Sequence, residues 1–193
     1  MAAAIYTTSN KEGVDVNQVF ILDTVGTPEA PGIPFNLGEV AKGTDGSEWA
    51  FCTASITIAA GSVVLVSQTP GNWSVALIGG ATVSAAANVT GLLVGVVGGS
   101  KGSLLVPAPS GTQKGMYFWV QRAGNAPNVK TLATTTIKSQ LHSSATLAGV
   151  LTSTGGGTNT TYQVTGIVIS VATGSAAGPN SAILNYPVVG ATS

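Results

Sequence analysis

The sequence predicts an all-β protein, a compact β-sandwich or barrel built from two similar β-units with an extended N-terminal arm. Apolar runs rich in β-branched and aromatic residues recur along the chain and are separated by turn residues, which is the pattern of short strands at sandwich or barrel spacing. No segment keeps the 3.6-residue apolar period of an amphipathic helix. With 193 residues, the chain is long enough to bury a core that needs no disulfide.

Residues 1–35 are expected to form the arm. They hold a single short apolar run, Val-Phe-Ile-Leu at residues 19–22, followed by Pro28, Pro31 and Pro34. Proline fixes φ and removes a backbone donor, so this segment cannot form a helix and is more typical of an extended arm than of a packed layer. Residues 36–193 are expected to form the all-β body and to fold without the arm.

Strands are predicted throughout the body, and only one segment could instead form a helix. Residues 130–142 have apolar side chains at Leu132, Ile137 and Leu141, but the β-branched residues at 134–137 disfavour a helix there. The predicted strands cover residues 48–54, 62–67, 73–78, 91–97, 116–121, 148–152, 163–171 and 182–189.

Two stretches of the body resemble two others. Residues 89–100 match residues 164–175 without gaps and are identical at six of twelve positions. A looser match joins residues 46–55 to residues 115–124, each a glycine turn followed by an aromatic-rich strand. We expect two similar β-units, at about 46–100 and 115–175, in one body. The alternative is chance similarity in a composition biased toward Gly, Val and Thr.

The charges divide the chain into two parts. Residues 1–48 carry seven acidic and two basic side chains, a net charge of −5, whereas residues 49–193 carry five basic and no acidic side chains. A stretch without carboxylates cannot build a carboxylate-based catalytic site or a hard-metal site from its own residues. Only 7% of the residues are charged, against about 25% in an average soluble domain. We therefore expect assembly rather than catalysis, with much of the surface covered by partners.

The remaining candidates for chemistry are weak. His142 stands beside Ser143 and Ser144, but no Gly-x-Ser-x-Gly motif exists, so we interpret it as a solvated histidine in a polar turn. The only cysteine, Cys52, lies in an apolar run and is expected to be buried and inert. Asp45 and Gly46 predict a turn rather than a calcium site. We predict no catalytic residue, cofactor or metal, and the chain is not expected to be an enzyme.

Neither a membrane nor nucleic acid is an expected partner. The longest apolar run, residues 89–97, is far shorter than the ~20 residues that a spanning helix needs. The N-terminus lacks the basic and apolar regions of a signal peptide. The basic residues of the body are scattered singly, whereas binding to nucleic acid rests on several phosphate contacts. We expect the chain to be made and used in a cytoplasm, or in a particle assembled there.

Several motifs together resemble the small all-β decoration (cement) proteins of tailed-bacteriophage capsids. They are Asp-Gly-Ser between a glycine and a tryptophan at residues 43–49, Ile-x-x-Gly-x-Val-Val at 58–64, and Gly-x-Tyr-x-Trp-Val-Gln-x-x-Gly at 115–124. A small-residue turn at 148–149 and Val-x-Gly-Ile at 164–167 follow. The resemblance covers about residues 36–190, and its most specific part is the Tyr-x-Trp-Val-Gln strand. It implies a protein without catalytic residues that sits as a trimer on the outer capsid surface.

The expected function is therefore that of a structural virion protein, which binds the outside of an assembled phage capsid and stabilises the shell. Its expected partners are the major capsid protein and further copies of itself, as a homotrimer. The alternative is a carbohydrate- or receptor-binding β-module, such as a head fibre or adhesin tip, with Trp49, Trp73 and Trp119 as a sugar platform. The candidate assembly contacts lie in the arm and are Asp15, Phe20, Ile21, Leu22, Asp23 and Glu29.

Overall fold

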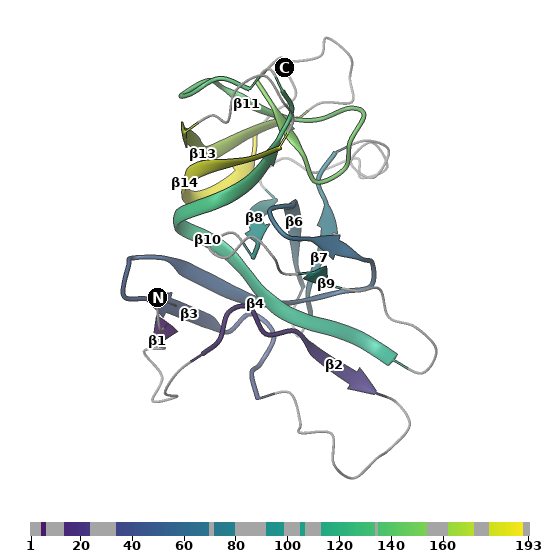
Figure 1. Cartoon of the computed structure of the whole chain (residues 1–193). Coiled ribbons are helices and arrows are strands. Elements are labelled where there is room, and N and C mark those ends of the chain that lie inside the picture. The colour runs from purple at the N-terminus through teal and green to yellow at the C-terminus, as the bar shows by residue number, and fades with distance from the viewer. Residues whose placement is uncertain are drawn as a thin grey trace.

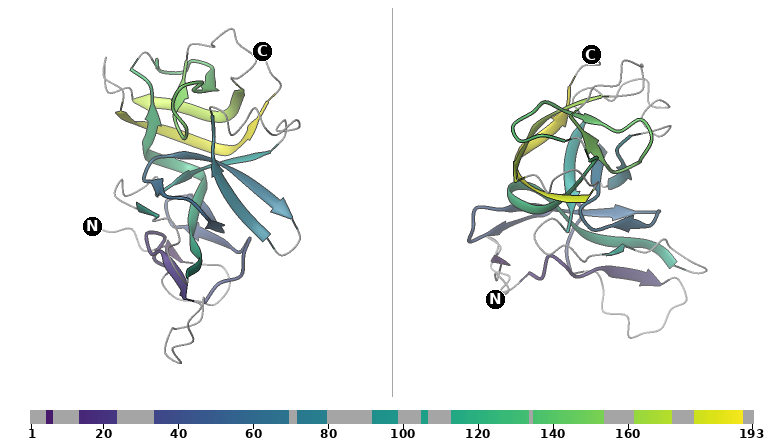
Figure 2. Two further views of the ribbon diagram at one scale, coloured as in Figure 1. Left: turned by 90° about the vertical axis from the view of Figure 1, so that its right-hand side faces the viewer. Right: turned by 45° about the horizontal axis from the view of Figure 1, so that its top comes forward.

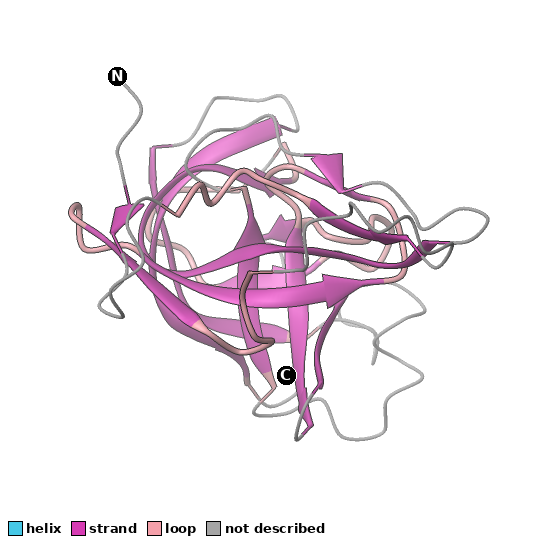
Figure 3. Ribbon diagram, turned by 90° about the horizontal axis from the view of Figure 1, so that it is seen from below, coloured by secondary structure: helices cyan, strands magenta, loops and turns pink. Residues whose placement is uncertain are grey.

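The computed structural model describes residues 5–6, 14–23, 34–69, 72–79, 92–98, 105–106, 113–133, 135–153, 162–171 and 178–190. Within these ranges every regular element is a β-strand, which confirms the predicted all-β fold (Figures 1 and 3). No helix in the described part of the chain could cross a membrane. The strands are β1 (Ile5–Tyr6), β2 (Phe20–Asp23), β3 (Val40–Gly43), β4 (Glu48–Ala54), β5 (Ile58–Ala59), β6 (Val63–Thr69), β7 (Asn72–Leu77), β8 (Leu93–Val97), β9 (Leu105–Val106), β10 (Gln113–Thr131), β11 (Leu141–Ser143), β12 (Leu151–Thr152), β13 (Gln163–Val171) and β14 (Gly178–Val189).

Each predicted strand has a counterpart in the structure, but one is far longer than expected. β4 and β13 have the predicted bounds, whereas β10 continues ten residues beyond its predicted end at Gln121. Register shifts between Gln121 and Ala123 and between Ala126 and Val129 let it continue. A β-bulge adds a residue to one strand and bends it without ending the pairing. Glycine and proline at 124 and 127 are therefore accommodated inside a strand.

β10 organises a 12-stranded sheet, because it pairs with β2, β4, β8, β12 and β14. Its pairing with β4 and β8 closes one ring in the order β4-β7-β6-β8-β10. Its pairing with β14 and β12 closes a second ring in the order β10-β12-β11-β13-β14. β10 runs diagonally between the two rings and belongs to both (Figures 1 and 2). Of the two predicted forms, a sandwich or a barrel, the body is closer to a barrel.

The two rings have the same topology. In the first, β4 pairs parallel with β7 through Thr53 and Ser74, and β7, β6 and β8 follow as antiparallel neighbours. In the second, β10 pairs parallel with β12 through Thr131 and Leu151, and β12, β11 and β13 follow as antiparallel neighbours. The sequence matches join β4 to β10 and β8 to β13, which occupy equivalent positions. The expectation of two similar β-units is confirmed, and shared topology favours repetition over chance.

Each ring is filled by its own apolar cluster, and β6 forms part of the wall between them. Val63 and Leu65 point into the cluster of the second ring, whereas Val64 and Val66 point into the cluster of the first. Alternate residues of a strand face opposite sides, so a strand between two cores must be apolar on both sides. This explains why the sequence has a continuous apolar run there.

A third cluster lies on the outer face of the β4–β10 pair. Trp49, Phe51 and Trp119 are fully buried there against Val14 and Val16 of the arm. Partly buried Phe20, Phe35 and Leu37 complete the cover. The described part of the arm therefore supplies a layer of the core. That the body folds without the arm stays a prediction, but the arm covers Trp49 and Trp119, so its removal should destabilise the body.

Candidate assembly surface

The structure brings four of the predicted contact residues together on one strand. Phe20, Ile21, Leu22 and Asp23 form β2, which pairs antiparallel with the first residues of β10. The register places Phe20 opposite Tyr117 and Ile21 opposite Met116. Glu29 lies outside the described residues. The apolar run of the arm is thus incorporated into the sheet of its own chain, at the end of the strand order.

Part of the Phe20 side chain packs against the third cluster. Its ring is half-buried and makes edge contacts with Phe35 and Phe51, each with ring centroids 5.8 Å apart. Phe35 in turn lies edge-on to Trp119 at 5.0 Å. Such edge-to-face arrangements are favoured by the quadrupoles of the rings. Phe20 therefore stabilises its own chain first, and only its remaining surface can contact a partner.

Asp15 is exposed, and its carboxylate is used locally. Its Oδ1 accepts hydrogen bonds from the backbone N and from Nδ2 of Asn17, both at 3.0 Å. The Asp15 carbonyl accepts a bond from the Gln18 amide at 3.1 Å. These bonds hold a turn, and they leave the negative charge at the surface beside buried Val14 and Val16.

Sequence reasoning missed a polar cluster that joins the two rings, made of Lys42, Glu48, Arg122 and Tyr186. The Tyr186 hydroxyl donates a hydrogen bond to Oε2 of Glu48 at 2.9 Å, and Nζ of Lys42 lies 3.8 Å from the same oxygen. The Arg122 guanidinium lies 5.7 Å from the centroid of the Tyr186 ring. The four residues come from β3, β4, β10 and β14, and no local signal in the sequence could have joined them.

Ala123 explains how these side chains meet. Its backbone is the register partner of Glu48 on one side and of Asn185 on the other. β10 therefore brings the end of β14 next to the start of β4. Lys42 is the register partner of Glu48 on β3, which places the ammonium group on the same carboxylate.

Electrostatics and backbone geometry both mark this cluster. The hydrogen bond to the Glu48 carboxylate raises the pKa of Tyr186 above its ordinary value, since the neutral phenol is the donor. Burial lowers the pKa of Arg122, although Glu48 opposes that shift. Tyr186 has a φ of 44°, a region that residues with a Cβ seldom occupy. The cluster also joins Glu48, the last acidic residue, to two residues of the acid-free part of the chain.

A second surface feature is an apolar outer face on β13 and β14. Val168 and Ile183 are direct register partners on these strands and are 44% and 54% exposed. Val171 is 57% exposed, and a register shift after Ile169 pairs it with Ser181, which places it on the same side as Ile183. Exposed Asn125 of β10 is the other register partner of Ile183. We call Val168, Val171, Ile183 and Asn125 the β13–β14 outer face. Their strand neighbours Ile169 and Ala182 point inward and are fully buried.

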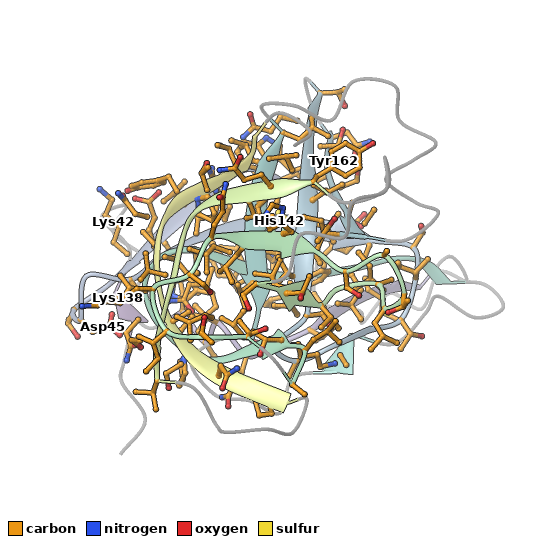
Figure 4. The ribbon with its side chains drawn as sticks, turned by 90° about the horizontal axis from the view of Figure 1, so that it is seen from above. Lys42, Asp45, Lys138, His142 and Tyr162 are labelled. Atoms are coloured by element: carbon orange, nitrogen blue, oxygen red, sulfur yellow. The ribbon has the colours of Figure 1, made fainter. Side chains whose placement is uncertain are left out.

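A turn with an exposed cation borders the β13–β14 outer face. The backbone amide of Lys138 donates a bond to the carbonyl of Ile169 at 3.3 Å, so the turn around Lys138 lies beside β13. Lys138 and Ile137 are both exposed. In Figure 4, Lys138 lies at the rim of the molecule.

The prediction of a solvated His142 in a polar turn is wrong. His142 is only 6% exposed and belongs to β11, where it pairs with Thr152 and Gln163; Figure 4 places it in the middle of the molecule. The hydroxyl of Ser143 accepts a bond from the Tyr162 amide at 3.0 Å. β12 and β13 pair with β11 on its two sides and bury it, although its serines are typical of a turn.

The tryptophans and the cysteine are parts of the core. Trp49 and Trp119 are fully buried, and Trp73 is half-buried against the cluster of the first ring. Three such residues do not form the sugar platform of the alternative function. Cys52 is buried as expected, and burial raises the pKa of its thiol to about 12, which keeps it protonated and unreactive.

Comparison with known proteins adds no assignment. No protein-family model matches the chain, and no curated protein matches it. Among the described residues, no three or more His, Cys, Asp and Glu side chains gather in a way that could hold a metal ion.

Proposed function

We propose that this chain is a structural virion protein that binds the outside of an assembled phage capsid and stabilises the shell, with the major capsid protein and further copies of itself as partners. The observation that carries the proposal is the β13–β14 outer face, where apolar side chains stand in water on a sheet whose inner side is packed. Burying apolar surface stabilises a complex by roughly 25 cal/mol per Å². Exposed apolar side chains on a regular sheet therefore support an assembly role.

The double ring suits a protein that must hold its shape under load. Both rings are filled by buried side chains, and β10 crosses from one to the other. A close-packed interior has low compressibility. A force applied at one ring is therefore transmitted to the other through a continuous strand.

The low charge of the chain suits dense coverage of a lattice. Its formal net charge is zero, and 7% of its residues are charged, so neighbouring copies repel one another little. A stable interface buries more than ~1,000 Å², and display of several copies at once raises the overall affinity. A homotrimer supplies both the area and the copies.

Binding to capsids tests the proposal. Purified chain is mixed with capsids of the phage that encodes it, prepared without this protein, and sedimented. We expect saturable binding in a fixed ratio to the major capsid protein, and capsids that resist heat and chelators better than bare ones. Absence of co-sedimentation, together with binding of the chain to host-cell glycans on an array, would overturn the proposal in favour of the receptor-binding alternative.

A further inference from the structure

We propose that the β13–β14 outer face binds the arm side of a second copy of this chain. The arm side is the surface around the arm and the β3–β4 hairpin that carries Asp15, Glu39 and Asp45. The inference rests on the self-association that is part of the proposed function, and it assigns that contact to a specific pair of surfaces.

The internal repeat shows that the two rings differ in what covers them. In the first ring, β10 closes on β4, and the outer face of that pair is covered by Val14, Val16 and Phe20 of the arm. In the second ring, β14 closes on β10, and the outer face of that pair carries exposed Ile183. Equivalent faces of equivalent rings thus differ, because one is covered within the chain and the other stands open to solvent.

Charge complementarity identifies the occupant. The β13–β14 outer face belongs to the part of the chain that has no acidic residue, and exposed Lys138 lies beside it. The carboxylate that contacts β14, that of Glu48, is already bonded to Tyr186 and lies near Lys42. An acidic partner surface would therefore meet an apolar face with a cation at its border and little like charge.

The arm side of this same chain has the required chemistry. Asp15 and Asp45 are exposed there, Glu39 is partly exposed, and the exposed cation of the same hairpin, Lys42, is paired with Glu48. The Asp45 carboxylate accepts a bond from the Ser47 amide at 3.0 Å, which holds its charge at the tip of the hairpin. Hydrogen bonding lowers the pKa of Asp45, so the group stays ionised at neutral pH.

The positions of the two surfaces determine the mode of association. β13 and β14 lie at one end of the molecule, and β1, β2 and β3 lie at the other (Figures 1 and 2). A contact between them joins unlike surfaces head to tail. Such an interface generates a closed ring when the rotation between copies closes, and a homotrimer is one such ring.

Oligomeric mass of the purified full chain, measured by light scattering over a range of concentrations and without capsids, tests the inference. Ile183→Asp should raise the dissociation constant of self-association at least about tenfold, since it replaces an apolar side chain by a carboxylate opposite the acidic residues of the second copy. Ile56→Asp is the matched control: it makes the same change at a side chain 40% exposed between β4 and β5, and it should leave the mass unchanged.

A second variant guards against misfolding. Val168→Thr combined with Ile183→Thr keeps β-branched residues in both strands and should weaken self-association with little change in melting temperature. Added salt should weaken self-association of the unaltered chain in part, because screening removes the charge contribution and leaves the apolar one.

The outcomes separate this inference from the proposed function. A chain that is monomeric at all concentrations, or variants that keep the full oligomer, would overturn the inference even if capsid binding is observed. Variants that keep the oligomer but lose co-sedimentation would show that the face binds the capsid instead. Loss of the oligomer in the variants, with no capsid binding by the unaltered chain, would leave the inference standing and the proposed function overturned.

Discussion

The phenol of Tyr186 donates a hydrogen bond to the carboxylate of Glu48 at 2.9 Å, across 138 residues of sequence. The contact ties β14 of the second ring to β4 of the first. It also joins the last acidic residue of the chain to the part that has none. Tyr186 is held there with a φ of 44°, an uncommon backbone conformation that persists only where the surrounding structure holds it.

The titration of Tyr186 tests this contact. A folded-state pKa above the unfolded value means that the contact stabilises the fold below the unfolded value of 10.0 and loses this effect as the pH rises through the folded value. We expect the difference between the 295 nm absorbance titrations of the unaltered chain and Tyr186→Phe to have its midpoint above pH 10. In a Glu48→Gln background, the midpoint should move back toward the ordinary value. A midpoint at or below 10 in the unaltered chain would contradict the contact.

Replacing Trp119 by Ala should destabilise the fold by about 3–5 kcal/mol, because the loss of a large buried aromatic leaves a cavity. Trp119 is fully buried, with its ring 5.0 Å from those of Phe35 and Phe51. Urea denaturation followed by circular dichroism measures the change. Trp73→Ala, at a half-buried ring, should cost less; an equal cost at both positions would count against the third cluster as described.

Removing the arm should destabilise the body. Val14 and Val16 are buried and Phe20 is half-buried, and full burial of each such side chain is worth about 1.5–3 kcal/mol. A chain that begins at residue 35 should therefore melt at a clearly lower temperature and bind a dye for exposed apolar surface. The paired change Val14→Ser and Val16→Ser should reproduce part of the effect in the full-length chain. A truncated chain with unchanged melting would show that the arm adds nothing to the core.

Gly61 should tolerate no side chain, because its backbone is bonded between β8 and β10. Its amide donates to the Val97 carbonyl, its carbonyl accepts from Lys130, and a Cβ there would collide with the carbonyl oxygen of Asn128. Gly46 is the matched control, because it has a similar positive φ and nothing within 4 Å of its Cβ position. We expect Gly46→Ala to cost roughly 1–2 kcal/mol for the left-handed backbone and Gly61→Ala to cost more. Equal stabilities of the two variants in urea would refute the clash.

Local sequence determined where the strands of the body form. β4 and β13 have the bounds that their runs of β-branched and aromatic residues predict, because such residues fit a pleated surface with little regard to distant partners. The repeat was readable for the same reason, since equivalent strands keep similar side chains. The turn at Asp45 and Gly46 also follows from local chemistry, as Gly46 adopts a φ of 80°.

Tertiary structure decided which strands meet, and therefore where the surface lies. The sequence placed Phe20, Ile21 and Leu22 in an arm, but their pairing with β10 depends on a strand about a hundred residues away. Val168 and Ile169 are adjacent β-branched residues in the same apolar run, yet Val168 is 44% exposed and Ile169 is fully buried. Alternation along a strand indicates that such neighbours face opposite sides. Which side is covered depends on non-local packing, and that packing alone separated the core of this protein from its candidate assembly surface.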